Sequence, residues 1–398
     1  MTLTLLLDLD DTLLSNSMES FLPGYLHELA RSLASYADVR KIAPELMAAT
    51  SMMLVNQQPD RTLEEVFDSS FYPALGIQKK QVAQAIDSFY AQDFPHLSKL
   101  TAARPQAICL VEEALARGYR VAIATAPLFP RTAILERLRW AGLSSDRYAF
   151  ALVPDYSSFH FAKPNPAYFA EFLAQLGWPD GPVLMVGDDY AADICGAQAL
   201  GLPVFWVKNG RDASENNQNH VPQGEIEDLL DWIDQQPEHK LKPHYNQPQS
   251  LCAILRATPA ALSTLSQNLP GRVQHERSLP HDWAPIEIIC HLRDVENEIN
   301  LPRLEQSLNE DNPFIAARDA EQWAESRKYL EQDNRQALTD FARSRTQLVN
   351  QLETLQPQDW QRSVRHAIFG PTTLLELVQF MADHDRLHIQ QFIQAKQN

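Results

Sequence analysis

The stretch Leu-Thr-Leu-Leu-Leu-Asp-Leu-Asp-Asp-Thr at residues 3–12 decides the fold of the first half of the chain. Its apolar run Leu3–Leu7 has the length of a buried strand and passes directly into carboxylates. Because side chains alternate along a strand, Asp8 and Asp10 are expected to point the same way. Two carboxylates aimed at one spot repel each other unless a cation lies between them or one is protonated. The stretch therefore predicts a site at the carboxyl end of a strand, where parallel sheets bind ligands.

Further along, short apolar runs alternate with helical stretches, which predicts βαβ units and a Rossmann-like α/β fold with a parallel sheet. The other expected strands are Val121–Thr125, Ala149–Val153, Val183–Gly187 and Pro203–Val207. The expected helices are Pro105–Gly118, Arg131–Ala141, Pro166–Leu176 and Ala191–Leu200. Residues 16–100 contain only helical patterns, so we expect a helical cap inserted after the first strand.

The second half of the chain has a different pattern. Residues 237–247 are rich in proline and polar residues, which is typical of a linker between a first domain at 1–236 and a second at 248–398. Beyond the linker, apolar residues recur with helical spacing and strand signals are absent, so an all-α four-helix bundle is expected. Its predicted helices are 250–268, 285–308, 321–355 with a break near Asp333, and 371–396.

Composition excludes several classes of function. The 34 Lys and Arg against 51 Asp and Glu give a net charge of −17, and no dense basic cluster occurs, so we expect neither nucleic-acid nor anionic-membrane binding. No apolar run is long enough to span a membrane, and the start of the chain lacks the features of a signal peptide. Four widely spaced cysteines without a CxxC motif indicate reduced, mostly buried thiols and a cytoplasmic location.

Polar residues follow three further strands or loops of the predicted sheet. Thr125 ends one strand, Lys163 lies in Ala-Lys-Pro-Asn-Pro just before a helix, and Gly-Asp-Asp-Tyr-Ala-Ala-Asp (187–193) follows another strand. Phosphate-ester hydrolysis needs a nucleophile, a proton donor for the leaving oxygen and cations to offset phosphoryl charge. These residues supply all three.

With these motifs in order, residues 1–236 resemble the haloacid dehalogenase superfamily of phosphohydrolases. The resemblance implies that Asp8 is the nucleophile, that Asp10 is the general acid and base, and that Thr125 and Lys163 hold the phosphoryl group. It also implies a Mg²⁺ site formed by Asp8, the Asp10 carbonyl and Asp188. Asp193 belongs to the same group of residues, with the role of positioning Lys163 or metal-bound water.

Two details refine this expectation. Dehalogenases of this superfamily typically lack the second aspartate, so Asp10 favours a phosphatase. Ala126 stands where such proteins often have asparagine; its backbone N–H can still donate to phosphate. The cap aromatics are expected to form the core of the cap rather than a substrate-stacking site: Phe67, Phe71, Tyr72, Phe89 and Tyr90.

Three histidines stand out in the second half. His384 and His388 share a helix face, and His291 lies on another apolar helix. The patterns Trp283-Ala284-Pro285, His291-Leu292-Arg293-Asp294 and His384-Asp385-Arg386-Leu387-His388 resemble the DinB-like four-helix metalloproteins. The resemblance implies a divalent metal site, Zn²⁺ or Ni²⁺, on the three histidines. Asp294, Glu296 and Asp385 either orient the histidine rings or are ordinary exposed helix charges.

The sequence therefore predicts a Mg²⁺-dependent phosphatase that hydrolyses a small phosphorylated metabolite through an aspartyl-phosphate, fused to a bundle with a second metal. One alternative places the main activity in the bundle, as a metal-dependent transferase or hydrolase that uses a thiol in some relatives. Another treats the bundle as a non-catalytic module for structure or homodimer formation.

Overall fold

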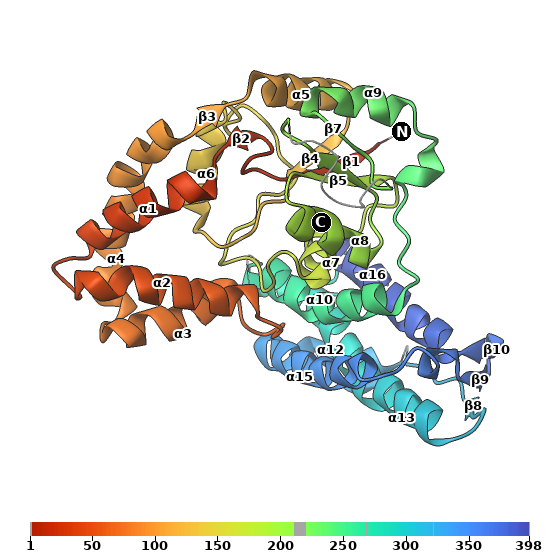
Figure 1. Ribbon diagram of the computed structural model, residues 1–398. Coiled ribbons are helices and arrows are strands. Elements are labelled where there is room, and N and C mark those ends of the chain that lie inside the picture. Colours follow the sequence, from red (N-terminus) through yellow and green to blue (C-terminus); the bar gives the residue numbers. More distant parts are fainter. Residues whose placement is uncertain (1, 211–219, 268, 280, 321, 398) are drawn as a thin grey trace. The chain divides into compact units, whose positions relative to one another are not determined.

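The structure is a computed structural model that describes residues 2–210, 220–267, 269–279, 281–320 and 322–397. The chain divides into two compact units, which we describe separately (Figure 1). The first comprises the described residues of Met1–Gln57, Arg61–Tyr168 and Pro179–His244, and the second comprises those of Gln58–Asp60, Phe169–Trp178 and Tyr245–Asn398. In the described part of the chain, no helix combines the length and hydropathy needed to cross a membrane.

A parallel five-stranded sheet of order β4-β1-β5-β6-β7 organises the first unit, which confirms the predicted α/β fold. Its strands are β1 (Thr4–Leu7), β4 (Arg120–Ile123), β5 (Val183–Gly187), β6 (Val204–Val207) and β7 (Gln223–Gly224). Leu7 pairs in register with Ile123 on one side and Val186 on the other. The carboxyl ends of the three strands β4, β1 and β5 therefore coincide, which brings the residues that follow them to one edge.

The expected strand Ala149–Val153 is wrong. The segment makes only two ladder-like bonds with the edge strand β4, from Ala151 N to Val121 O (2.8 Å) and from Ile123 N to Leu152 O (2.9 Å). Pro154 follows at once and has no amide proton with which to extend the pairing. The segment is apolar because it lies beside the sheet. The strand was predicted from this apolar run, which a segment beside the sheet shares with a strand inside it.

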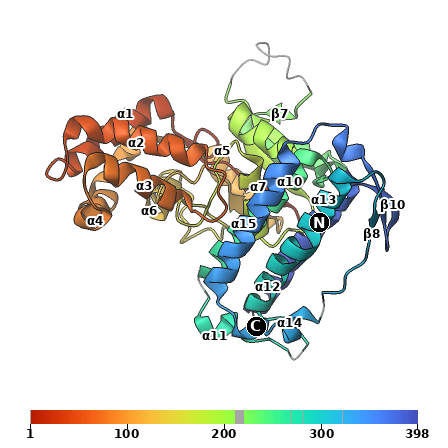
Figure 2. The same ribbon diagram turned by 90° about the horizontal axis from the view of Figure 1, so that it is seen from below.

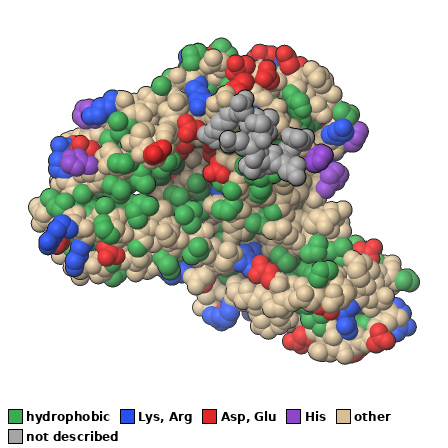
Figure 3. Space-filling view, viewed as in Figure 1, with side chains coloured by type: hydrophobic (Ala, Val, Ile, Leu, Met, Phe, Trp, Pro, Cys, Tyr) green, Lys and Arg blue, Asp and Glu red, His purple; other side chains and the backbone are tan. Residues whose placement is uncertain are grey.

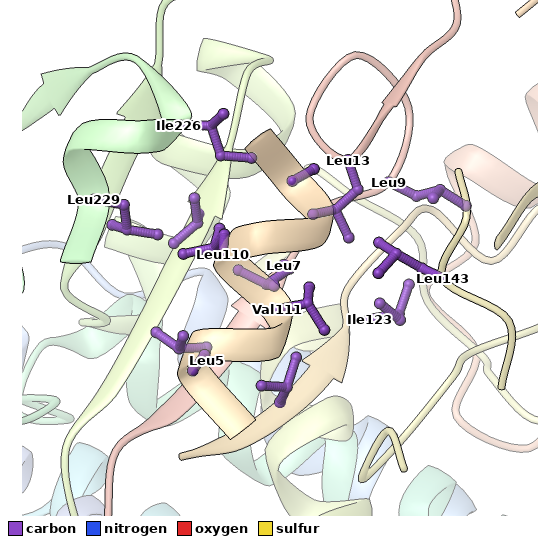
Figure 4. Packing of buried hydrophobic residues seen from close by; sticks show 14 of the residues in the cluster. Leu5, Leu7, Leu9, Leu13, Leu110, Val111, Ile123, Leu143, Ile226 and Leu229 are labelled. Carbon is purple, nitrogen blue, oxygen red and sulfur yellow. The ribbon is translucent and has the colours of Figure 1, made fainter. Parts of the chain in front are cut away.

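Helices cover the sheet and bury its apolar residues. Figure 4 shows Leu110 and Val111 of α5 (Pro105–Ala116) against Leu5 and Leu7 of β1, with Leu229 of α9 (Leu229–Asp234) beside them. Each fully buried side chain of this size contributes about 1.5–3 kcal/mol. The other helical elements of this unit are α6 (Arg131–Trp140), the π-helical turn η3 (Tyr190–Cys195), α8 (Gly196–Leu200), η5 (Ile226–Asp228) and η6 (Glu238–Leu241). The helix α7 (Pro166–Gln175) begins in the first unit, and its residues from Phe169 onward belong to the second.

The segment after β1 is helical, as expected for a cap. It contains α1 (Met18–Ser32), α2 (Val39–Leu54), α3 (Leu63–Leu75), α4 (Lys79–Ser88), the π-helical turn η1 (Phe89–Asp93) and the 3-10 helix η2 (Phe94–Leu100) (Figure 2). A short antiparallel ribbon joins β2 (Leu14–Ser15) to β3 (Ala102–Ala103) where the segment leaves and rejoins the sheet. A capping box of Thr62 and Glu65 fixes the start of α3.

The second unit is built around long helices that pack in pairs, which confirms the predicted bundle. Both α15 (Asn334–Glu353) and α16 (Leu374–Gln397) pack against α10 (Pro248–Gln267) and α12 (Pro285–Val295). After α12 the chain continues through a π-helical turn, η7 (Glu296–Asn300), into α13 (Leu301–Asn309). The shorter elements are α11 (Gly271–Gln274), α14 (Trp323–Ser326), η8 (Tyr329–Glu331) and η9 (Asp359–Gln361).

The expectation that this half contains no strands is wrong. β8 (Phe314–Ile315), β9 (Ser363–His366) and β10 (Gly370–Thr373) form a small sheet of order β10-β9-β8. The pairs are two to four residues long, too short for an alternating pattern to be detected in the sequence. Gly370, at φ +76°, permits the turn between β9 and β10. Because β10 occupies residues 370–373, the last helix begins at Leu374 and not at residue 371.

Candidate active site and metal centre

Asp8 lies directly after β1 and is buried, and its backbone N–H donates to Val186 O (2.9 Å). The buried ammonium of Lys163 donates to Asp8 Oδ1 (2.7 Å) and to Asp193 Oδ1 (2.5 Å). One lysine therefore joins a carboxylate from the first strand to one that follows β5. The structure brings these three sequence-predicted residues together.

The loop after β5 fixes Asp193 through its own backbone. Asp189 N donates to Asp193 Oδ2 (3.1 Å), while Asp189 Oδ1 accepts bonds from the backbone N–H groups of Ala191 and Ala192 and so starts the π-helical turn η3. A Cβ at Gly187 would lie 2.2 Å from Asp193 Oδ2, so only glycine fits there. Asp189 is thus a helix-starting carboxylate.

Asp188 completes a cluster of carboxylates. Among the described residues, Asp8, Asp188 and Asp193 each offer an oxygen within 4.8 Å of the others. Thr12 Oγ1 donates weakly to Asp188 Oδ1 (3.5 Å), and Trp206 Nε1 donates to the Asp188 carbonyl (2.9 Å). A hard divalent cation such as Mg²⁺ prefers oxygen ligands of this kind, so the residues fit the predicted cation.

Burial sets the electrostatics of this cluster. It raises the pKa of Asp8 to about 7, with the neighbouring Asp193 adding to the rise and Lys163 opposing it. Burial also raises the pKa of Asp193, again against Lys163. For Lys163 burial lowers the pKa, but the attraction of Asp193 and Asp8 outweighs it and the net change is upward. The lysine stays charged, and two carboxylates compete for it.

Asp10 is held by two residues that the sequence reasoning missed. Its carboxylate forms an ion pair with Arg137 of α6 and accepts a bond from Asn16 Nδ2 (2.7 Å). Arg137 is only 1% exposed, and its Nε and Nη2 have no hydrogen-bond partner among the described residues. A signal was present: Arg137 lies on the same helix face as the apolar Ala133, Ile134 and Leu138, where a charge is out of place.

Thr125 is buried beyond the end of β4, and its carbonyl accepts a bond from Tyr168 Oη (2.8 Å). The hydroxyl group of Thr125 and the backbone of Ala126 are the phosphate-binding groups expected from the sequence. Both follow the strand next to β1.

The raised pKa of Asp8 predicts how the folding stability of the chain depends on pH. In the folded wild-type chain Asp8 binds its proton more tightly than when unfolded, so stability falls as pH rises from about 4 through about 7. In Asp8→Asn the asparagine side chain does not titrate in this pH range, and Lys163 stays paired with Asp193. With chelator present, we expect Asp8→Asn to be more stable than wild type by at least about 1 kcal/mol at pH 8 and by much less at pH 4. Thermal unfolding at both pH values measures this; a variant less stable at pH 8 would contradict it.

The second cluster is formed by the three predicted histidines. His384 Nε2 lies 3.2 Å from His291 Nε2 and 3.0 Å from His388 Nε2, so the same ring atom of each points at one spot. The Nδ1 atoms of His291 and His388 are buried without a hydrogen-bond partner in the described part of the chain. Trp283 stacks on His388, with centroids 5.7 Å apart. Three converging imidazole nitrogens fit a divalent metal.

Burial keeps these rings neutral, and the charge of a neighbouring histidine further lowers the pKa of His291 and of His388. Burial lowers the pKa of His291 to about 2, of His388 to about 3 and of His384 to about 4. Neutral imidazole is the form that binds metal. The histidines line a cavity of about 600 Å³ together with Trp283 and Arg318, which leaves space for a ligand beside the three ring nitrogens.

The acidic residues near the histidines have another role. Arg345, 1% exposed, donates from Nε to Glu296 Oε1 (2.7 Å) and pairs with Asp385, and both carboxylates are buried. Asp294 accepts from Tyr329 Oη (2.8 Å) and pairs with arginines. The sequence predicts that Asp294, Glu296 and Asp385 either orient the histidine rings or are exposed helix charges. The structure shows neither role among the described residues, because all three are buried and pair with arginines.

Comparisons with known proteins agree with the two-part organisation. The family model of haloacid dehalogenase-like hydrolases matches residues 2–201, and that of the DinB superfamily matches residues 254–392. Phospholysine phosphohistidine inorganic pyrophosphate phosphatase of Bos taurus is 29% identical over 79 residues, which are 19% of this chain and 29% of that protein. The chain therefore spans less than a third of the length of this curated relative.

Two solved structures are among those similar to this chain. The haloacid dehalogenase-type phosphatase of Thermococcus onnurineus is 20% identical, with 58% of this chain and 98% of that chain covered and a TM-score of 0.39. YfiT of Bacillus subtilis, described as a probable metal-dependent hydrolase with an unusual four-helix bundle topology, is 20% identical, with 41% and 91% covered and a TM-score of 0.36.

Proposed function

The chain belongs to the haloacid dehalogenase-like hydrolases, and on this basis we propose that its first domain is a Mg²⁺-dependent phosphatase acting on a small phosphorylated metabolite. The observation that carries the proposal is the pair of bonds from Lys163 to Asp8 and Asp193, beside a third carboxylate on Asp188. We assign this domain to residues 1–236, followed by a linker at 237–247, and we place the protein in the cytoplasm.

The proposed reaction has two steps. In the first, an Asp8 oxygen bonds to phosphorus while the bond from phosphorus to the leaving oxygen breaks, and Asp10 gives that oxygen a proton. In the second, Asp10 takes a proton from water, the water oxygen bonds to phosphorus, and the bond to Asp8 breaks to release phosphate. Asp10 and Asp8 return to their starting states.

The other residues act on the phosphoryl group. Lys163 and the Thr125 hydroxyl hold its oxygens, and Asp193 positions Lys163. Asp8, Asp188 and the Asp10 carbonyl would hold Mg²⁺, which supplies positive charge to offset the phosphoryl oxygens. Arg137 and Asn16 fix the Asp10 carboxylate, so these two are positioning residues.

Phosphate release from a panel of compounds tests this proposal. The panel contains pyrophosphate, sugar phosphates, nucleotides and small phospho-acids, each with Mg²⁺ and with chelator. We expect Mg²⁺-dependent release from at least one class, reduced at least about 100-fold in Asp10→Asn, because a general acid–base group contributes about 10²–10⁴. Equal rates in the Asp10→Asn variant, or in chelator, would refute the proposed mechanism.

We further propose that the second domain, residues 248–398, holds Zn²⁺ or Ni²⁺ on His291, His384 and His388 and acts as a metal-dependent enzyme. The convergence of three Nε2 atoms on a large cavity supports this proposal. The metal would supply Lewis-acid chemistry to a ligand in the cavity. The alternative of a non-catalytic bundle that forms a homodimer predicts no metal.

Metal analysis of the full chain separates these alternatives. We expect close to one equivalent of divalent metal after dialysis, and a loss of most of it in His384→Ala. His275→Ala is the matched control, because His275 is an exposed histidine of the same unit. Absence of metal in the wild-type chain, or equal metal in both variants, would favour the structural module.

A further inference from the structure

The cap contains an apolar pocket of about 160 Å³ that the sequence reasoning did not anticipate. Its walls come from the cap helices, from residues 128–130, which follow Thr125 along the chain, and from Tyr156. Among the described residues that line it, none carries a charge; its walls include Tyr25, Met47, Tyr72, Tyr90, Phe129 and Tyr156. Four cap aromatics expected only in the core therefore line a cavity: Phe67, Phe71, Tyr72 and Tyr90.

A chain of side-chain contacts links the pocket to the proposed catalytic centre. Phe129 lines it, and the Phe129 ring also faces the Arg137 guanidinium at 4.6 Å. Arg137 in turn forms the ion pair with Asp10, the residue proposed to protonate the leaving oxygen. Tyr25, on the cap side, contacts Phe129 with ring centroids 5.3 Å apart. A group attached to the leaving oxygen would therefore point from Asp10 past Phe129 toward the pocket.

The walls favour an apolar occupant over a sugar or a second phosphate. The hydroxyl groups of Tyr25 and Tyr90 are bonded to each other at 2.9 Å, and burial raises the pKa of Tyr25 to about 12 and raises that of Tyr90 as well, so both stay neutral. A polyhydroxylated group would lose its bonds to water and find few partners here. Aromatic walls instead favour ring stacking. An apolar cavity of roughly 150 Å³ is large enough to bind one benzene ring, which makes 160 Å³ a fit for a single ring.

We propose that this pocket receives the leaving group of the phosphoester and that the leaving group is a single aromatic ring. The inference rests on the proposed phosphatase function and narrows its substrate class. The mouth of the pocket is apolar as well: Met18 and Met47 are 42% and 40% exposed. Figure 3 shows hydrophobic side chains gathered over the cap helices α1 and α2.

Binding of two non-hydrolysable phosphonates to the full chain with Mg²⁺ tests the inference. Benzylphosphonate carries an aromatic ring and methylphosphonate does not. Both carry the phosphonate group, which the catalytic centre would hold in place of a phosphoryl group. We expect benzylphosphonate to bind at least tenfold more tightly, because burying a ring favours binding by well over the 1.4 kcal/mol that a factor of about ten represents. Titration calorimetry gives both dissociation constants.

Two variants of α2 form a matched pair. Met47→Gln changes a residue that lines the pocket, and Met52→Gln changes an exposed methionine of the same helix that does not. Met47→Gln should weaken benzylphosphonate binding about threefold or more and leave methylphosphonate unchanged, because only the ring loses apolar contact. Met52→Gln should change neither.

The outcomes separate this inference from the proposed function. If both phosphonates bind equally well, the catalytic centre holds the phosphonate but the pocket takes no ring, so the inference fails and the phosphatase stands. If neither binds and no compound of the panel releases phosphate, the proposed function fails and the inference falls with it. If Met47→Gln but not Met52→Gln dissociates a dimer in sedimentation, a second copy of the chain covers the pocket and the inference is overturned.

Discussion

Replacing Asp8 with asparagine should lower phosphate release by a factor on the order of 10⁴ or more, because the side chain would no longer carry the oxygen nucleophile on which the proposed reaction depends. The substituted amide keeps nearly the same shape at the end of β1, and it removes one of two carboxylates that compete for Lys163. The variant should therefore fold. Its turnover on the best compound of the panel, with Mg²⁺, is the measurement.

Asp11→Asn is the matched control for this loss. Asp11 lies within the same stretch, Asp8–Thr12, at φ 55°, a conformation that asparagine tolerates. Its Oδ1 accepts a bond from Asn16 N (3.0 Å) that an amide oxygen can also accept. We expect Asp11→Asn to stay within about threefold of wild type, because loop polar contacts of this kind are worth only about 1 kcal/mol. Equal losses in both variants would point to a general disturbance of the loop and would contradict the special role of Asp8.

The second large effect concerns stability. Arg345→Met should destabilise the bundle by about 3–5 kcal/mol, because it leaves the carboxylates of Glu296 and Asp385 buried without their cation. Arg345 also donates from Nη1 to the Leu255 carbonyl of α10 (2.8 Å), so the same side chain joins three helices and the π-helical turn η7. Chemical denaturation of the full chain, followed by a signal from the second unit, measures the loss.

Arg343→Met provides the comparison on the same helix. Arg343 is exposed and pairs with Asp340 at 3.3 Å, three residues away. Exposed pairs of this kind contribute about 0–1 kcal/mol, so we expect little change. If the two variants lost the same stability, the buried network would not be the element that holds the bundle together.

The sequence predicted those features that depend on local pattern and on spacing along strands. The run Leu3–Leu7 and the placement of Asp8 at the end of this strand follow from the period of a strand and from the parallel topology. Lys163 and Asp193 were predicted from their motifs and from the order of these motifs along the chain. The structure places these side chains within hydrogen-bond distance. The three histidines were predicted from helix spacing and a family resemblance, and their ring nitrogens converge.

Other features depend on tertiary packing that no local pattern reveals. Arg137 reaches Asp10 across 127 residues of sequence, and only its place on an apolar helix face marks it in the sequence. The strands β8 and β9 lie far apart in the sequence and are too short to detect by alternation. The aromatic residues of the cap look the same in sequence whether they fill a core or line a pocket, because that depends on how neighbouring helices diverge.

If Asp8 carries the phosphoryl group between the two proposed steps, the aspartyl-phosphate can be trapped. The full chain is mixed with Mg²⁺ and the best substrate, quenched in acid within milliseconds and digested, and the peptides are analysed by mass. We expect one phosphoryl group on the peptide that contains Asp8, labile to hydroxylamine and missing in Asp8→Asn. Turnover of the substrate with no phosphoryl group on this peptide, or with the label on another residue, would contradict it.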